Sequence, residues 1–208
     1  DMQPDFVWIK NRDAGDSHLL TDAVRGVTKV LYCDSSSGED TEAGSVKSIT
    51  SDGFTVGTLG GINTNTEKYV AWCWKAGTTA SISGGDLTPG GVSINTTSKF
   101  GIYIYDGGGT TNTIAHGLGV APEMVVLKSR STDVVWLVGH HKVNNGTNPF
   151  NYELNFDTSD AQSADTMFNN TAPSSTLVTL GNVTGSNNSG KTYVMYTFAG
   201  VQGYSKFG

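Results

Sequence analysis

The chain has 208 residues, a formal net charge of −6 at neutral pH and 15% charged residues. Its length accommodates one or two domains, and 27 glycines with few strong helix formers favour strands joined by turns. No cluster of Lys or Arg is present, and no apolar run approaches the roughly 20 residues of a membrane-spanning helix. We therefore expect no nucleic-acid binding and no membrane insertion. The first residues lack a basic segment followed by an apolar one, so we expect no signal peptide there.

Short apolar segments bounded by turn residues predict a series of strands. In chain order they are Phe6–Lys10, Phe54–Val56, Tyr69–Trp74, Gly101–Tyr105, Met124–Lys128, Leu177–Leu180 and Tyr193–Phe198. The first and fifth are near-continuous apolar runs, which is typical of central strands buried on both faces. Asp22–Val27 and Asp160–Met167 are weaker candidates for short helices. Strands at this spacing, with turn signals between them, predict an all-β fold of the sandwich type.

An internal repeat relates the two halves of the chain. Pro4–Arg12 (PDFVWIKNR) matches Pro122–Arg130 (PEMVVLKSR) at an offset of 118 residues. Two further pairs match at an offset of 124 residues, namely Ser51–Gly57 with Ser175–Gly181 and Tyr69–Trp74 with Tyr193–Phe198. The increase of the offset from 118 to 124 means that the second copy has six extra residues, which we place in the Asn-rich stretch Lys142–Asn151. The repeat predicts two related antiparallel β-sandwich modules, either separate or packed as one body.

A second duplication marks the place where the two modules meet. Ser98–Gly101 and Ser205–Gly208 both read SKFG at an offset of 107 residues, so the join after the first copy is 17 residues longer. The extra length falls in Gly77–Thr97, which is rich in Gly, Ser and Thr and reads as a linker or a long excursion. We therefore divide the chain into a first module at 1–77, a connecting segment at 78–97 and a second module at 98–208.

The first module begins too late in the repeat to contain an opening strand. In the second module, Ile102–Tyr105, the hairpin Asp106–Gly109 and the turn His116–Gly119 precede the matched region. A sandwich that lacks a strand has unpaired backbone groups at one edge. Either the long connecting segment folds back onto this edge or a neighbouring polypeptide donates a strand. We expect the second arrangement, and with it self-association of the chain.

Paired basic residues end the same strand in both copies, Lys10 with Arg12 and Lys128 with Arg130. Alternation places each pair on one face of its strand, so we expect the two pairs to bond carboxylates or loop carbonyls in equivalent ways. This is a structural role. His116, in the turn sequence His-Gly-Leu-Gly, is likewise predicted to pack against its own module.

Three tryptophans are the candidate ligand-binding residues. Trp72 and Trp74 share one face of their predicted strand, with Cys73 on the other, and with Trp136 they offer rings on which sugars can stack. The alternative is that all three indoles are buried, since Trp in a strongly apolar strand usually belongs to the core.

The sequence offers only weak metal candidates. Asp157, Asp160 and Asp165 lie within nine residues and suggest calcium, but the Gly and Glu of an EF-hand loop are absent. The alternative is a solvated acidic segment at a helix start. His140 and His141 point to opposite faces of a strand and do not chelate one metal together. We expect no cofactor and no resident metal.

Cysteine usage and catalytic motifs add little. Cys33 and Cys73 are too few for the disulfide framework of a small secreted scaffold, and a bridge between them is left open. No Ser-His-Asp set, carboxylate pair or nucleotide-binding fingerprint stands out, so we expect a protein that is not an enzyme.

A series of short motifs runs through the second copy, namely His116-Gly-Leu-Gly, Pro122 with its strand ending at Lys128-x-Arg130, Trp136, Leu177–Gly181, Asn187-x-Ser-Gly190, Tyr193–Phe198 and Gly203–Gly208. With these motifs, the second copy resembles a module of tail-fibre-like virion proteins of marine and environmental bacteriophages. The resemblance covers 98–208 closely, and 3–77 only in Pro4–Arg12, Ser51–Gly57 and Tyr69–Gly77.

The resemblance implies jelly-roll or concanavalin-like sandwiches in a non-enzymatic virion protein, such as a tail fibre, capsid fibre or decoration protein. Such a protein lies on the virion, outside the cell, and serves assembly or host attachment. Its implied partners are other virion proteins or copies of itself, and host surface glycan. The alternative is a lectin-like carbohydrate-binding module of a phage or secreted bacterial protein. A hydrolase is a third hypothesis, which would need carboxylates or His at strand ends in a pocket.

Overall fold

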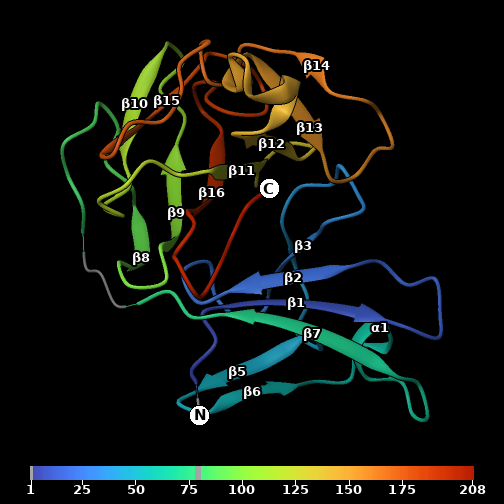
Figure 1. The fold of residues 1–208 in the computed structure, drawn as a ribbon. Coiled ribbons are helices and arrows are strands. Elements are labelled where there is room, and N and C mark those ends of the chain that lie inside the picture. The colour runs from blue at the N-terminus through green and yellow to red at the C-terminus, as the bar shows by residue number, and fades with distance from the viewer. Residues whose placement is uncertain (1, 78–80) are drawn as a thin grey trace.

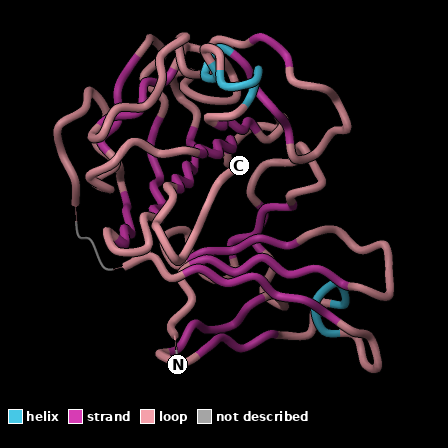
Figure 2. Tube along the Cα trace, in the orientation of Figure 1, coloured by secondary structure: helices cyan, strands magenta, loops and turns pink. Residues whose placement is uncertain are grey.

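Strands dominate the structure, and helices are confined to short turns (Figures 1 and 2). The structure, a computed structural model, describes residues 2–77 and 81–208. Strands hold 38% of the residues and helices 5%, and the strands form several antiparallel sheets. The protein is therefore all-β, as its composition of turn formers and short apolar segments predicts.

The first half of the chain forms a five-stranded sheet in the order β4-β3-β2-β1-β7. Its strands are β1 (Phe6–Asn11), β2 (Leu19–Asp22), β3 (Lys29–Tyr32), β4 (Asp40–Thr41) and β7 (Tyr69–Trp74). A hairpin of β5 (Val46–Thr50) and β6 (Gly53–Val56), with the short helix α1 (Gly60–Asn63), covers the outer face of this sheet. Val7, Ile9 and Leu19 of the sheet pack there against Val46 and Ile62.

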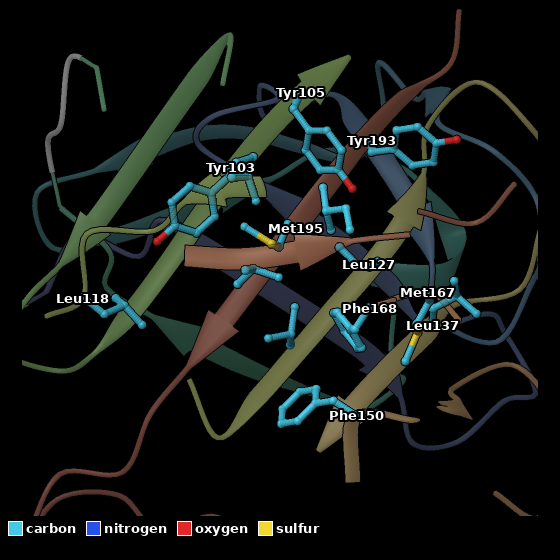
Figure 3. Close-up of a cluster of buried hydrophobic side chains, with 14 of the residues drawn as sticks. Tyr103, Tyr105, Leu118, Leu127, Leu137, Phe150, Met167, Phe168, Tyr193 and Met195 are labelled. Atoms are coloured by element: carbon cyan, nitrogen blue, oxygen red, sulfur yellow. The ribbon is translucent and has the colours of Figure 1, made fainter. Parts of the chain in front are cut away.

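The second half forms a seven-stranded sheet in the order β14-β13-β12-β11-β16-β9-β8. Its strands are β8 (Gly91–Asn95), β9 (Phe100–Asp106), β11 (Met124–Ser129), β12 (Leu137–His140), β13 (Tyr152–Asn155), β14 (Ser163–Ala164) and β16 (Thr192–Phe198). A two-stranded sheet of β10 (Asn112–Ala115) and β15 (Leu177–Leu180) covers the outer face, and the 3-10 turns η1 (Val143–Gly146) and η2 (Pro149–Asn151) connect β12 to β13. Figure 3 shows the core under this cover, including Tyr103, Leu127, Phe168 and Met195.

The two large sheets pack on each other through their inner faces (Figure 1). Phe6, Leu20 and Leu31 of the first sheet share one buried cluster with Val126 and Tyr196 of the second. The chain is therefore a stack of four layers, with the β5–β6 hairpin and the β10–β15 pair on the outside. A face buried against another sheet needs apolar residues at alternate positions, and these strands supply them.

Strand pairing repeats between the two sheets with the offsets of the sequence repeat. Phe6 lies opposite Trp74 in the ladder of β1 and β7, and Met124 lies opposite Phe198 in the ladder of β11 and β16. Every other pair of these two ladders corresponds in the same way. β2 pairs on the far side of β1 as β12 pairs on the far side of β11, again at corresponding residues.

Backbone hydrogen bonds at the strand ends repeat as well. The Arg12 N–H donates to the Lys68 carbonyl at 2.8 Å, and the Arg130 N–H donates to the Thr192 carbonyl at 2.8 Å. At the next strands, β3 and β4 correspond to β13 and β14 at an offset of 123 residues. Five of the six extra residues therefore lie between β12 and β13, where the sequence analysis places the added loop.

Both predicted helices are wrong. In Asp22–Val27, β2 ends at Asp22, whose Oδ1 accepts the N–H of Val24 at 3.0 Å and of Arg25 at 2.8 Å, and Gly26 with φ of 104° redirects the chain. In Asp160–Met167, the short strand β14 pairs with β13 instead. Asp and Ser favour such turns because their side chains compete with helical backbone bonds.

Part of the predicted connecting segment is a strand. Gly91–Asn95 forms β8 and extends the seven-stranded sheet beside β9, while residues 78–80 of the segment lie outside the described part of the chain. The idea that this segment folds back onto the first module's open edge is wrong for the residues described, because β8 joins the other sheet.

Candidate functional site

A buried charge network ties the two sheets together. Arg25 donates from Nε to Asp22 Oδ2 at 2.5 Å, and both side chains are fully buried. Tyr196 of β16 donates its hydroxyl to the same carboxylate oxygen at 2.7 Å. Burial alone lowers the pKa of Arg25, but the neighbouring Asp22 outweighs it and the pKa is raised above its ordinary value. The guanidinium therefore stays charged in the interior.

Glu39 extends this network to the surface. It accepts from Arg25 at 3.2 Å and from two nitrogens of Arg130 at 2.9 Å each, so it bridges the two halves of the chain. Burial raises the pKa of Glu39, but the hydrogen bonds from Arg130 and the charge of Arg25 lower it by more, so the net shift of the pKa is downward. A bidentate carboxylate–guanidinium pair of this kind fixes geometry as well as charge.

The predicted basic pairs behave alike at the lysines and differently at the arginines. Lys10 donates to the Asp16 carbonyl at 2.7 Å, and Lys128 donates to the corresponding Val134 carbonyl at 2.8 Å. Lys128 is buried and also donates to the Ser36 carbonyl of the first half at 2.8 Å. Burial lowers the pKa of Lys128 to about 8.

Arg12 does not share the environment of Arg130. Arg130 binds Glu39, whereas Arg12 is exposed and its side chain has no hydrogen bond within residues 2–77 and 81–208. The expected equivalence therefore fails at this position, because Arg130 reaches a carboxylate and Arg12 forms no ion pair among the described residues.

His116 lies at the start of the predicted turn and is fully buried. Its Nδ1 accepts the Leu118 N–H at 3.2 Å, which leaves Nε2–H to donate to the Ser174 carbonyl at 3.1 Å. Burial lowers the pKa of His116. A neutral imidazole with both nitrogens bound to its own module is a structural group, and Tyr103 adds a bond to its carbonyl.

An aromatic cavity of about 120 Å³ lies between the two sheets. Its lining includes Phe6, Trp8 and Trp74 from the first sheet, Met124 and Phe198 from the second, and Phe207 near the C-terminal end. The Trp8 Nε1–H is buried and has no partner among the described residues. Apolar cavities of this size hold small apolar groups rather than water.

Of the three candidate tryptophans, only Trp72 presents a ring to solvent. It is 43% exposed and lies 5.5 Å from Trp8, centroid to centroid. Trp74 is half-buried on the cavity wall. Trp136 is fully buried and donates Nε1–H to the Tyr32 carbonyl at 2.9 Å, so its assignment to ligand stacking is wrong.

The weak calcium candidates do not converge. Asp157 Oδ1 accepts the Trp136 N–H at 3.0 Å, Asp165 Oδ1 accepts the Met167 N–H at 2.5 Å, and Asp160 lies in the exposed loop between them. Within the described part of the chain, no three acidic, His or Cys side chains are placed to hold a metal ion. Two of the three carboxylates are thus already used to fix the backbone.

The adjacent histidines and the cysteines have separate environments. His141 Nε2 bonds the Phe207 carbonyl at 2.7 Å, and His140 Nδ1 accepts the Lys142 N–H at 3.1 Å. Cys33 packs in the cluster between the sheets and Cys73 under the β5–β6 hairpin. Both thiols are free, and they lie on opposite faces of the first sheet.

The Asp22, Arg25 and Glu39 network was not predicted from the sequence. Its signal was an acid–base pair, Asp22 and Arg25, three residues apart directly after a short apolar segment.

Comparison with known proteins gives one family. The model of a domain of unknown function, DUF7483, matches residues 1–208. No curated protein and no solved structure matches the chain. No helix among residues 2–77 and 81–208 has the length and apolar character to cross a membrane.

Proposed function

The chain belongs to the DUF7483 family, and we propose that it is a non-enzymatic structural module of a bacteriophage virion. The proposal covers a tail fibre, a capsid fibre or a decoration protein, placed outside the cell with a role in assembly or host attachment. The proposal rests on the resemblance of the second copy to phage virion modules and on the architecture of the whole chain.

The observation that carries the proposal is the joint between the two sheets. Corresponding strands of the two halves pair in the same register, and their inner faces pack on each other. We propose that 1–77 and 98–208 are two copies of one module that evolved by duplication, because a pair related in this way buries equivalent faces as a symmetric dimer does. The buried Arg25, Lys128 and His116 all bind groups of the fold itself, which suits a rigid building block.

Localisation of the chain tests this proposal directly. Antibodies raised against residues 1–208 are applied to purified phage particles whose genome encodes the chain, followed by gold labelling and mass spectrometry of the particles. We expect labelled particles and a copy number in simple ratio to other virion proteins. Detection of the chain only in the lysate, and never in purified particles, contradicts the virion role.

Carbohydrate binding is the second candidate, and exposed aromatic rings favour it. Trp72 is 43% exposed and Phe156 is 38% exposed, and their rings lie 5.5 and 6.0 Å from that of Trp8. Such a row can receive the apolar face of a sugar. A glycan array tests it, with Trp72→Ala expected to abolish binding and Tyr204→Ala, at an aromatic position that is 68% exposed, as the control. Retention of glycan binding by Trp72→Ala contradicts this assignment.

A further inference from the structure

Strand β7 ends the five-stranded sheet and has β1 as its only neighbour among the residues that the structure describes. In an antiparallel pair, alternate residues direct their backbone groups to the partner. The Arg12 N–H to Lys68 carbonyl bond fixes that alternation. The backbone N–H and carbonyl groups of Tyr69, Ala71 and Cys73 therefore point away from β1, along the open edge.

The corresponding edge in the second sheet is occupied. β16 pairs with β11 as β7 pairs with β1, and on its other side β9 pairs with β16 over seven residues. The Gly107 N–H donates to the Lys191 carbonyl and the Ala199 N–H to the Lys99 carbonyl, which extends that ladder at both ends. β16 is buried along almost its whole length, whereas Ala71 and Trp72 of β7 are exposed.

The open edge also lacks the features by which natural sheets protect their edges. Tyr69–Trp74 reads YVAWCW, with no charged residue and no proline, and its pairing with β1 has no bulge. Edges that remain free usually carry Lys, Pro or a bulge, because a flat apolar edge recruits another strand. The composition of β7 is that of an inner strand.

The shape of a strand that would fit this edge follows from β9. Phe100 and Ile102 of β9 enter the cluster between the two sheets, opposite Phe198 and Tyr196. In β7, Trp74 corresponds to Phe198 and Trp72 corresponds to Tyr196. Trp74 lies on the cavity wall, and Trp72 is exposed. A strand with Phe and Ile at these positions would cover Trp72 and the adjoining side of the cavity.

The C-terminal SKFG motif is consistent with this placement. Phe100 is the Phe of the first SKFG and begins β9, and Phe207 is the Phe of the second. Phe207 lines the same cavity as Trp74 and Met124. The second motif thus places its Phe at the cavity that Trp74 also lines, with its ring centroid 5.9 Å from that of Phe198.

We propose that the outer edge of β7 is a docking site for the opening strand of a further module of this kind, with the alternation of Phe100–Asp106. The strand docks antiparallel, with its Phe opposite Trp74 and its first Ile opposite Trp72. The site stands on strand register and does not require the virion role proposed above. Through this edge, the two-sheet unit formed by this chain would accept a strand from the next module. Main-chain hydrogen bonds and apolar side chains would join the two.

A peptide with the sequence of Ser98–Gly107 is the probe, added to the purified chain and followed by hydrogen exchange and titration. We expect the amides of Ala71 and Cys73 to exchange at least about tenfold more slowly with peptide bound, because each gains a carbonyl partner. Methylation of the peptide nitrogen at Tyr103 should weaken binding about tenfold or more, because that N–H faces the partner strand. Methylation at Ile102 is the matched control and should leave binding within about twofold, since that N–H faces away.

Variants of the protein separate the docking site from general stability. Ala71→Pro removes an edge N–H that bonds nothing in β1 and should abolish peptide binding, whereas Ala71→Ser should bind as the unmodified chain does. If Ala71→Pro unfolds the chain, the proposal is still tested by comparing the binding of the two methylated peptides to the unmodified chain. The proposal is overturned if the peptide does not bind, if it protects β16 instead of β7, or if a second copy already protects β7 in the absence of peptide.

Discussion

Replacing Asp22 by Asn should destabilise the chain more than any comparable change at its surface. The side chain of Asp22 is fully buried between Arg25 and the Tyr196 hydroxyl. Asp22→Asn keeps an oxygen for the turn N–H groups but removes the nearest negative charge from Arg25, and Glu39 at 3.2 Å is the carboxylate that remains in contact with it. Breaking a buried pair from one side costs about 3–5 kcal/mol, and the remaining Glu39 places the expected loss near the lower limit, about 3 kcal/mol.

Urea unfolding monitored by tryptophan fluorescence measures this loss. At a slope of about 2 kcal/mol per M, the midpoint should fall by about 1.5 M. Asp40→Asn is the matched control, because Asp40 is exposed and takes part in no ion pair within the described residues, and it should change stability by less than about 0.5 kcal/mol. The reasoning is refuted if the two variants unfold at the same urea concentration.

Three further predictions concern the core, the pH dependence and activity. Gly139→Ala would place a Cβ 2.2 Å from the Phe168 ring and should cost about 1–3 kcal/mol by calorimetry, whereas Gly53→Ala meets nothing within 4 Å and should be neutral. Because the pKa of Lys128 falls to about 8, the unfolded chain, with a Lys pKa of about 10.4, binds more protons between these values. The stability of the unmodified chain relative to Lys128→Met should therefore rise from pH 8 to about 10, and a constant or falling difference in urea unfolding contradicts this. The purified chain should release no product from polysaccharides, peptidoglycan or nucleotides in chromatographic assays, and cleavage that disappears on changing one acidic residue would overturn the non-enzymatic assignment.

Long apolar strands could be predicted from the sequence nearly to the residue. Tyr69–Trp74 and Leu177–Leu180 coincide with β7 and β15, because each is a run of strand formers closed by turn residues. One of the strands that were missed owes its place to a partner rather than to its own pattern. Gly91–Asn95 is Gly- and Ser-containing and reads as linker, yet β9 holds it in the ladder as β8.

The joint between the sheets could not be predicted in the same way. The repeat indicated Lys128 and Arg130, since basic residues recurred at one strand end, but not that Lys128 is buried and bonded to Ser36 in the other half. Asp22 and Arg25 lay in a segment that the sequence indicated only as a weak candidate for a short helix. The Tyr196 hydroxyl that binds Asp22 belongs to a residue 174 positions away in the chain, so the contact has no local signal.

Co-purification of the two halves tests most directly whether the two large sheets form one folding unit through their packed inner faces. Residues 1–84 and 85–208 are expressed as separate chains, each with its own tag, alone and together. The shared cluster of Phe6, Leu20, Val126 and Tyr196 predicts that the halves aggregate when expressed alone and form a stable one-to-one complex when expressed together, with a single cooperative unfolding transition. Two halves that purify as folded, independent monomers and do not associate would contradict the account.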